Sequence, residues 1–217
     1  MRTDAEVKRD VEAELQWSPE LDATDIGVTV TGAAVSLGGF ARNLFEKYAA
    51  ERAARCVKGV AAVANDIVVR IPVDGPTDPE IARAAALALQ LNMPEIFQDI
   101  QPVVHEGHVA LLGTVQWHYQ RQLAERLVHA LKGVIGVRNS IRVQPRAAVE
   151  HDIKERIEAA FRRQAKLDAR QIAVDAVGSE VTLRGEVRSW SERDQAQTTA
   201  WSAPGVTNVH NELTVRT

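Results

Sequence analysis

The stretch GVTNVHNELTV, residues 205–215, decides the fold because the chain contains its pattern three times. Residues 59–69 read GVAAVANDIVV and residues 133–143 read GVIGVRNSIRV, with an Asn at the same place in each copy. Each copy starts twenty residues after the last glycine of a V-x-L-x-G phrase, at Gly39, Gly113 and Gly185. Such fixed spacing is the signature of an internal repeat.

Working outward from these phrases defines three units. The second and third copies align with the first at shifts of 74 and 146 residues without a gap. The units span 4–71, 78–144 and 150–216, and we expect each to be a domain, since about 68 residues can form a core. Pro and Gly in the segments between them predict short, stiff connectors.

Hydrophobic periodicity predicts the order of elements within one unit. Apolar residues four positions apart, such as Val7, Val11 and Leu15, indicate an amphipathic first helix. An alternating run, a turn and the V-x-L-x-G phrase then predict a β-hairpin. A second helix begins at capping-box pairs such as Asn43 with Glu46 and is expected to stop at the glycine of the opening phrase, at Gly59, Gly133 or Gly205. The opening phrase is the third strand. The fold class is therefore α+β: three αββαβ units, each with two helices on one face of a three-stranded sheet.

The V-x-L-x-G strand, the Ala-bearing helix and the phrase G-V-x-x-V-x-N-x-[IL]-x-V resemble the BON domain, named for bacterial osmotically inducible and nodulation proteins. The resemblance covers nearly the whole chain, three times. It implies the αββαβ fold with a three-stranded mixed sheet and no known catalytic machinery, and we expect no cofactor. It also implies a role in osmotic or general stress and binding to phospholipid surfaces or to proteins.

Composition sets further limits. The chain has 217 residues with 45% hydrophobic and 25% charged residues, as in ordinary globular proteins. Its net charge of -3 does not favour a nucleic-acid partner. The charged N-terminal stretch and the absence of a long apolar run predict a cytoplasmic protein without a transmembrane segment. The single cysteine, Cys56, excludes an intramolecular disulfide and is interpreted as a small core or boundary residue.

The repeated glycines and asparagines are interpreted as structural. Glycine within a strand costs about 0.5–1 kcal/mol relative to alanine, so its repetition predicts a close approach of helix to sheet or a bulge; the alternative is the approach of a ligand. Asn65, Asn139 and Asn211 share strand parity with core residues, where an amide must be hydrogen-bonded. We expect them to bond backbone near the start of their strand; the alternative is ligand binding.

Differences among the copies point to function. The outward sheet positions carry Phe40 and Val68 in repeat one and Val103 and Leu112 in repeat two, but mainly charged residues in repeat three. We expect the first two faces to contact another domain, a partner or a second subunit.

Aromatic residues mark the starts of the second helices. Trp117 and Tyr119 replace the cap in repeat two, and Trp190 follows the cap in repeat three. They could anchor at a lipid interface or a protein groove, or could cover their own core as a hydrophobic staple. Trp17 and Trp201 are expected to close the cores of their helices.

Two further groups are weaker candidates. Arg162, Arg163 and Lys166 could contact lipid phosphates, although interleaved acids also predict a solvated face with pairs such as Glu158 and Arg162. His105, Glu106 and His108 lie in a turn and lack a fourth ligand, so no metal site is predicted.

No nucleophile–base pattern, phosphate loop or paired carboxylates suggest catalysis. The leading hypothesis is a non-enzymatic binding or scaffolding protein. Peripheral phospholipid binding is the first alternative, and an ion or ligand sensor using clefts between repeats is the second.

Overall fold

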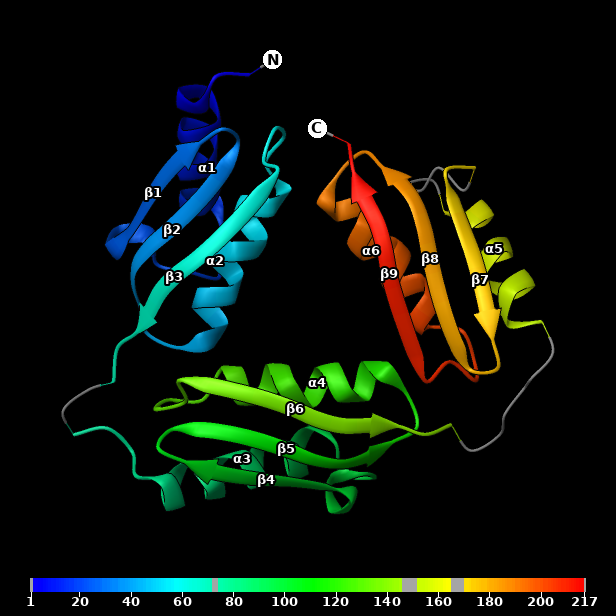
Figure 1. Cartoon of the computed structure of the whole chain (residues 1–217). Helices are drawn as coiled ribbons and strands as arrows, with labels where there is room; N and C mark the ends of the chain where they lie inside the picture. The colour runs from blue at the N-terminus through cyan, green and yellow to red at the C-terminus, as the bar shows by residue number, and fades with distance from the viewer. Residues whose placement is uncertain (1, 72–73, 146–151, 165–169, 217) are drawn as a thin grey trace. The chain divides into compact units, whose positions relative to one another are not determined.

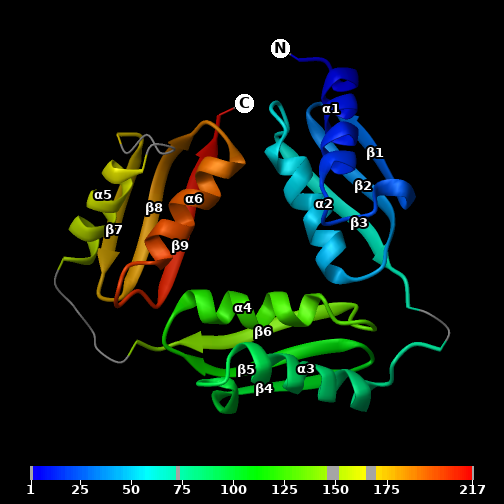
Figure 2. The ribbon, with the colours of Figure 1, turned by 180° about the vertical axis from the view of Figure 1, so that it is seen from behind.

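The computed structural model describes residues 2–71, 74–145, 152–164 and 170–216. It contains three three-stranded sheets with strand orders β1-β2-β3, β4-β5-β6 and β7-β8-β9. In each repeat, the two helices cover one face of the sheet and leave the other face open (Figures 1 and 2). The predicted α+β class of three αββαβ units is confirmed.

The elements follow the same order in all three repeats. Repeat one comprises α1 (Asp4–Trp17), β1 (Ile26–Thr31), β2 (Ala34–Ala41), α2 (Leu44–Cys56) and β3 (Ala62–Val69). Repeat two comprises α3 (Asp78–Asn92), β4 (Ile100–His105), β5 (His108–Val115), α4 (His118–His129) and β6 (Gly136–Val143). Repeat three comprises α5 (Ile153–Arg163), β7 (Ile172–Val177), β8 (Glu180–Val187), α6 (Trp190–Trp201) and β9 (Asn208–Val215). In the first and third sheets the central strand pairs antiparallel with the first strand and parallel with the last.

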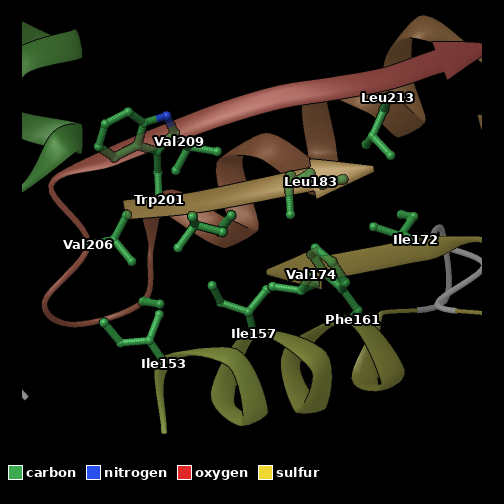
Figure 3. Close-up of a cluster of buried hydrophobic side chains, with 14 of the residues drawn as sticks. Ile153, Ile157, Phe161, Ile172, Val174, Leu183, Trp201, Val206, Val209 and Leu213 are labelled. Carbon is green, nitrogen blue, oxygen red and sulfur yellow. The ribbon is translucent and has the colours of Figure 1, made fainter. Parts of the chain in front are cut away.

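The core of each repeat lies between its helices and its sheet. In repeat one, Val7, Val11 and Leu15 of α1 are buried against Leu37 and Ile67 of the sheet. Figure 3 shows the equivalent cluster of repeat three, in which Ile153, Ile157 and Phe161 project from α5 toward the strands. The spacing of four residues places these side chains on one stripe of the helix, as the periodicity predicts.

The second helices begin as predicted and end earlier. Asn43 Oδ1 accepts the N–H of Glu46 at 2.9 Å, and Glu46 Oε2 accepts the N–H of Arg42 at 3.0 Å. However, α2 ends at Cys56, three residues before Gly59, so the predicted stop at the glycine was wrong. The glycine instead lies in the following loop with φ +96°, a backbone conformation that residues with a Cβ rarely adopt.

Repeat two keeps half of the cap despite Trp117 at the cap position. Gln120, at the position of Glu46, accepts the N–H groups of Gln116 and Trp117 at 3.1 and 3.0 Å. The interpretation that this repeat loses its cap was therefore incomplete, because an amide oxygen accepts a backbone N–H as a carboxylate does.

The glycine of V-x-L-x-G lies opposite the residue two positions after the repeated asparagine in the sheet. Gly39 has φ +114° and faces Ile67 of β3, and a Cβ on Gly39 would lie 2.0 Å from the carbonyl oxygen of Asp25. Oδ1 of Asn65 accepts the N–H of Ile67 at 3.3 Å. In repeat three, Gly185, Leu213 and Asn211 repeat this arrangement, with the corresponding bond at 3.2 Å.

Backbone hydrogen bonds explain why an extra acceptor is needed there. The amide of Ala61 donates to the oxygen of Ala33 before β3, and the amide of Arg70 donates to the oxygen of Ala41 after it. These donors are nine residues apart and their acceptors eight. Because alternate amides of a strand face the same neighbour, the stretch 61–70 contains one irregular step in its hydrogen bonds, although the Cα register of β2 with β3 is continuous. The Asn65 side chain supplies an acceptor inside that stretch.

The same asparagine also ties the strand to the second helix. Nδ2 of Asn65 donates to the oxygen of Lys47 at 3.0 Å and to Oε2 of Glu51 at 3.1 Å. Nδ2 of Asn139 donates to Glu125 at 3.1 Å, and Nδ2 of Asn211 donates to Gln197 at 3.0 Å. The partners thus lie on α2, α4 and α6 and in mid-strand, whereas the sequence analysis placed them at the strand's start.

Candidate functional site

The outward face of the first sheet carries large apolar side chains only at one end. Its exposed side chains are small or polar over most of the surface, at Thr29, Ser36 and Ala64. Phe40 and Val68 are paired across β2 and β3 and are 42% and 57% exposed. The guanidinium of Arg70 lies 4.1 Å from the centre of the Phe40 ring, so the ring is partly shielded on one side. The larger part of this apolar end remains accessible.

The outward face of the second sheet combines apolar and basic side chains. Val103 on β4 is 51% exposed and Leu112 on β5 is 41% exposed. Arg138 and Arg142 are exposed outward positions of β6, and their side chains form no ion pair within the described residues. The sequence analysis did not single them out, although their alternation with the inward Asn139 and Ile141 would have placed them on this face.

The third sheet presents a mainly charged outward face, with Val177, at the end of β7, as its exposed large apolar residue. Arg184 donates from Nη1 to Asp175 and from Nε to Glu212, both at 2.8 Å. The hydrogen bond and charge of Glu212, followed by those of Asp175, raise the pKa of Arg184 above its usual value. The charge of Arg184 is therefore paired with acidic side chains of the same face. Phe40, Val68, Val103 and Leu112 correspond by the repeat shifts to Glu186, Thr214, Asp175 and Arg184.

The aromatic side chains at the helix starts differ in exposure. Trp117 is partly exposed beside the start of α4, and Tyr119 is more exposed. Trp190 is half-buried at the first residue of α6, with the guanidinium of Arg193 5.5 Å from its ring centre. Tyr119 is thus the most accessible of the three.

Two other tryptophans behave differently from each other. Trp201 belongs to the buried cluster of repeat three (Figure 3). Trp17 is 82% exposed, so the expectation that it closes a core was wrong. It lies two residues after the buried Leu15, and a rotation of about 200° turns it away from the core. Leu91, at the same repeat position in α3, is exposed as well.

The basic residues of α5 lie on its solvent side. Arg162 is 3.9 Å from Glu158 in the i, i+4 pair, and Arg163 is exposed at the end of the helix. Lys166, the third residue of this group, lies outside the described residues. Surface pairs at such a distance contribute little to stability.

Neither a metal site nor a membrane-spanning helix emerges from the described residues. No group of three His, Cys, Asp or Glu side chains within them could hold a metal ion, and this includes the His105–His108 turn. None of the helices in the described ranges is both long and apolar enough to cross a membrane. The outward faces of the first two sheets, with their exposed apolar side chains, are the main candidate site.

Comparison with known proteins places these features in context. A family model described as BON domain matches residues 3–71, 77–145 and 150–217. Osmotically-inducible protein Y of Escherichia coli (strain K12) is 28% identical over 147 residues, which are 65% of this chain and 73% of that protein.

Two solved structures also resemble the chain. Both are of CdsD, a structural protein of the type III secretion system of Chlamydia trachomatis, one of them its C-terminal domain. They are 16% and 15% identical and have a TM-score of 0.28 each. They cover 97% and 96% of this chain, and the matches span 92% and 96% of the CdsD chains.

Proposed function

The chain belongs to the BON domain family, and we propose that it is a non-enzymatic binding protein of a stress response that docks a protein partner through the outward faces of its first two sheets. The relation to an osmotically-inducible protein supports the stress assignment. Cys56 is exposed, so its interpretation as a core or boundary residue was wrong. An exposed thiol is compatible with a reducing compartment such as the cytoplasm, which cell fractionation would test.

The observation that carries the docking proposal is the contrast among the three faces. Phe40, Val68, Val103 and Leu112 are exposed apolar side chains, whereas repeat three has charged or polar residues at all four equivalent positions. The same fold thus tolerates charged or polar side chains at these four outward positions. Apolar residues on the other two faces are not required by the fold, and a partner that covers them would gain from their burial.

The repeats themselves supply the test. The changes Phe40→Glu, Val68→Thr, Val103→Asp and Leu112→Arg transfer the outward residues of repeat three to repeats one and two. A photo-cross-linking amino acid is placed at Ala64, Ala110 or Ala173, one outward position in each sheet. We expect a discrete adduct in cells from positions 64 and 110 but not from 173, and we expect the four changes to remove it. Equal adducts from all three positions, or an adduct that survives the four changes, would refute the proposal.

Phospholipid binding is the second candidate, and Arg138 and Arg142 favour it. They share the outward face of the second sheet with Val103 and Leu112, and a basic face with apolar side chains suits an anionic membrane surface. Flotation with anionic and zwitterionic vesicles at low and high salt measures this binding. Loss on Arg138→Ser with Arg142→Thr supports the sheet face, whereas loss on Arg162→Gln with Arg163→Gln supports α5. Flotation that is absent with anionic vesicles excludes this candidate.

A further inference from the structure

A hollow of about 600 Å³ lies within repeat one, at the C-terminal end of α1. Its apolar lining comes from Leu15, Leu21 and Ile26, and its polar lining includes Glu12, Gln16 and Asp22. This volume is in the range of small-molecule sites. The hollow lies on the helix side of one repeat, so it is separate from the outward sheet faces and from any cleft between repeats.

A single small residue distinguishes this place from its counterpart in repeat two. Ala23, which lines the hollow, is the first residue of the 3-10 turn Ala23–Asp25 that leads into β1. The equivalent turn of repeat two is Phe97–Asp99, and its first residue is a half-buried phenylalanine. Both turns end at the start of the first strand, so the backbone accepts either side chain. The methyl group of Ala23 leaves room where repeat two carries a ring.

The charges around the hollow select a cation. Glu12 and Asp22 line it, and none of the lining residues in the described part of the chain is a Lys, Arg or His. Hydrogen bonds from the hydroxyl and the N–H of Thr24 lower the pKa of Asp22, so this carboxylate is ionised at neutral pH. The α1 C-terminus, where the helix dipole also favours a cation, has no basic residue in its last turn.

The basic side chains near the hollow are already in ion pairs, and one of these pairs is weak. Arg42, whose charge reaches Asp22, is engaged by Glu46 at 2.6 Å. Lys8 Nζ lies 3.7 Å from Oε1 of Glu12, and about half of each side chain is exposed. Such a pair contributes little, so an incoming ammonium group can replace Lys8 beside Glu12.

We propose that this hollow binds a small primary alkylammonium compound. Its ammonium group donates hydrogen bonds to Glu12 and Asp22, and its alkyl part contacts Leu15, Leu21 and Ile26. Because the lining residues that the structure describes include no aromatic ring, they offer none of the cation–π contacts that recognise quaternary ammonium groups. A primary ammonium is therefore favoured over a quaternary one.

The proposal is tested by NMR titration of the full chain with butylammonium, 1-butanol and tetramethylammonium. We expect butylammonium to shift the backbone amides of Gln16 and Ala23 in a saturable manner, with the other two compounds binding at least threefold more weakly. Glu12→Gln should weaken butylammonium binding by up to about fivefold, and Lys8→Gln should strengthen it, because half-exposed charge pairs contribute about 0.2–1 kcal/mol. Glu20→Gln is the matched control, because Glu20 pairs with Arg52 and does not line the hollow.

Two changes that block the site complete the test. Ala23→Phe copies repeat two and should lower the affinity at least tenfold, and Gln16→Arg introduces a competing cation at an exposed position that needs no repacking. Binding that persists in both variants overturns the assignment to this hollow. Absence of saturable shifts up to about 50 mM butylammonium, or equal affinity for 1-butanol, overturns the proposed ligand class.

Discussion

Replacing Gly39 by alanine tests the central structural inference, which is that this glycine is required by close backbone contact. A Cβ at this position would lie 2.0 Å from the carbonyl oxygen of Asp25, and φ is +114°. The adjacent Gly38 is an ideal control, since a Cβ there would meet nothing within 4 Å. Gly32 separates the effect of a positive φ from the effect of steric contact, because it has φ +57° but open space around its missing Cβ.

The expected loss in the free energy of unfolding is the sum of backbone strain and steric overlap. Backbone strain in a region that favours glycine costs about 1–3 kcal/mol, and forcing a carbon into a filled space adds about 1–3 kcal/mol. Gly39→Ala should therefore destabilise repeat one by about 4 kcal/mol, Gly32→Ala by about 1 kcal/mol, and Gly38→Ala by less than about 0.5 kcal/mol. A repeat of this size has a stability of only about 3–10 kcal/mol, so the first change brings it close to unfolding.

Hydrogen exchange with peptide-level mass spectrometry measures this in the full chain, because it reports the opening of each repeat separately. Slowly exchanging amides of β2 and β3 should lose protection in Gly39→Ala, while those of β8 and β9 keep it. If Gly39→Ala and Gly38→Ala leave the amides of repeat one equally protected, the close contact with Asp25 does not limit the fold and the reasoning is wrong.

Three further predictions concern the hydrogen bonds that recur among the repeats. Asn65→Ala leaves the amide of Ile67 without its side-chain acceptor, so repeat one should lose about 1–3 kcal/mol, measured by hydrogen exchange; an unchanged exchange rate of Ile67 would contradict this. Asn43→Ala removes a helix cap and should cost about 1 kcal/mol by the same measurement, with faster exchange confined to the first turn of α2. Hydrogen bonds from Gly107 and Glu106 lower the pKa of Asp78 below 3.8, so its contribution to stability is complete above that pH and is lost as the pH falls through the lower folded value. The amide shift of Gly107 should titrate below pH 3.8, and Asp78→Asn should abolish that titration.

The repeat pattern made most of the fold predictable. Periods of two and of about 3.6 residues in three aligned copies define nine strands and six helices within the described residues, and the first copy shows the principle with Val7, Val11 and Leu15. Details that depend on partners across the fold were less predictable. The acceptor of the Asn65 amide lies on α2, and the helix stops before Gly59. Neither follows from the spacing of residues along the chain.

The candidate sites show the same division. The outward orientation of Phe40 and Leu112 was predicted from the sequence, because successive side chains of a strand point to opposite faces of the sheet. Arg138 and Arg142 follow the same rule, and their exposure on the outward face of β6 agrees with it. Trp17 was misassigned because a large apolar residue at a helix end was expected to be buried, whereas its position around the helix directs it outward.

The sequence by itself determined the three-fold repetition, the order of elements and the αββαβ fold, because these depend on local periodicity and on identical spacing. Tertiary structure decided that Gly39 lies opposite Ile67, whose N–H donates to the Asn65 side chain, since residues distant in sequence meet there only after the strands pair. It also decided that Ala23 leaves a hollow where repeat two carries Phe97. Open space depends on how neighbouring elements pack, and no single position in the sequence encodes it.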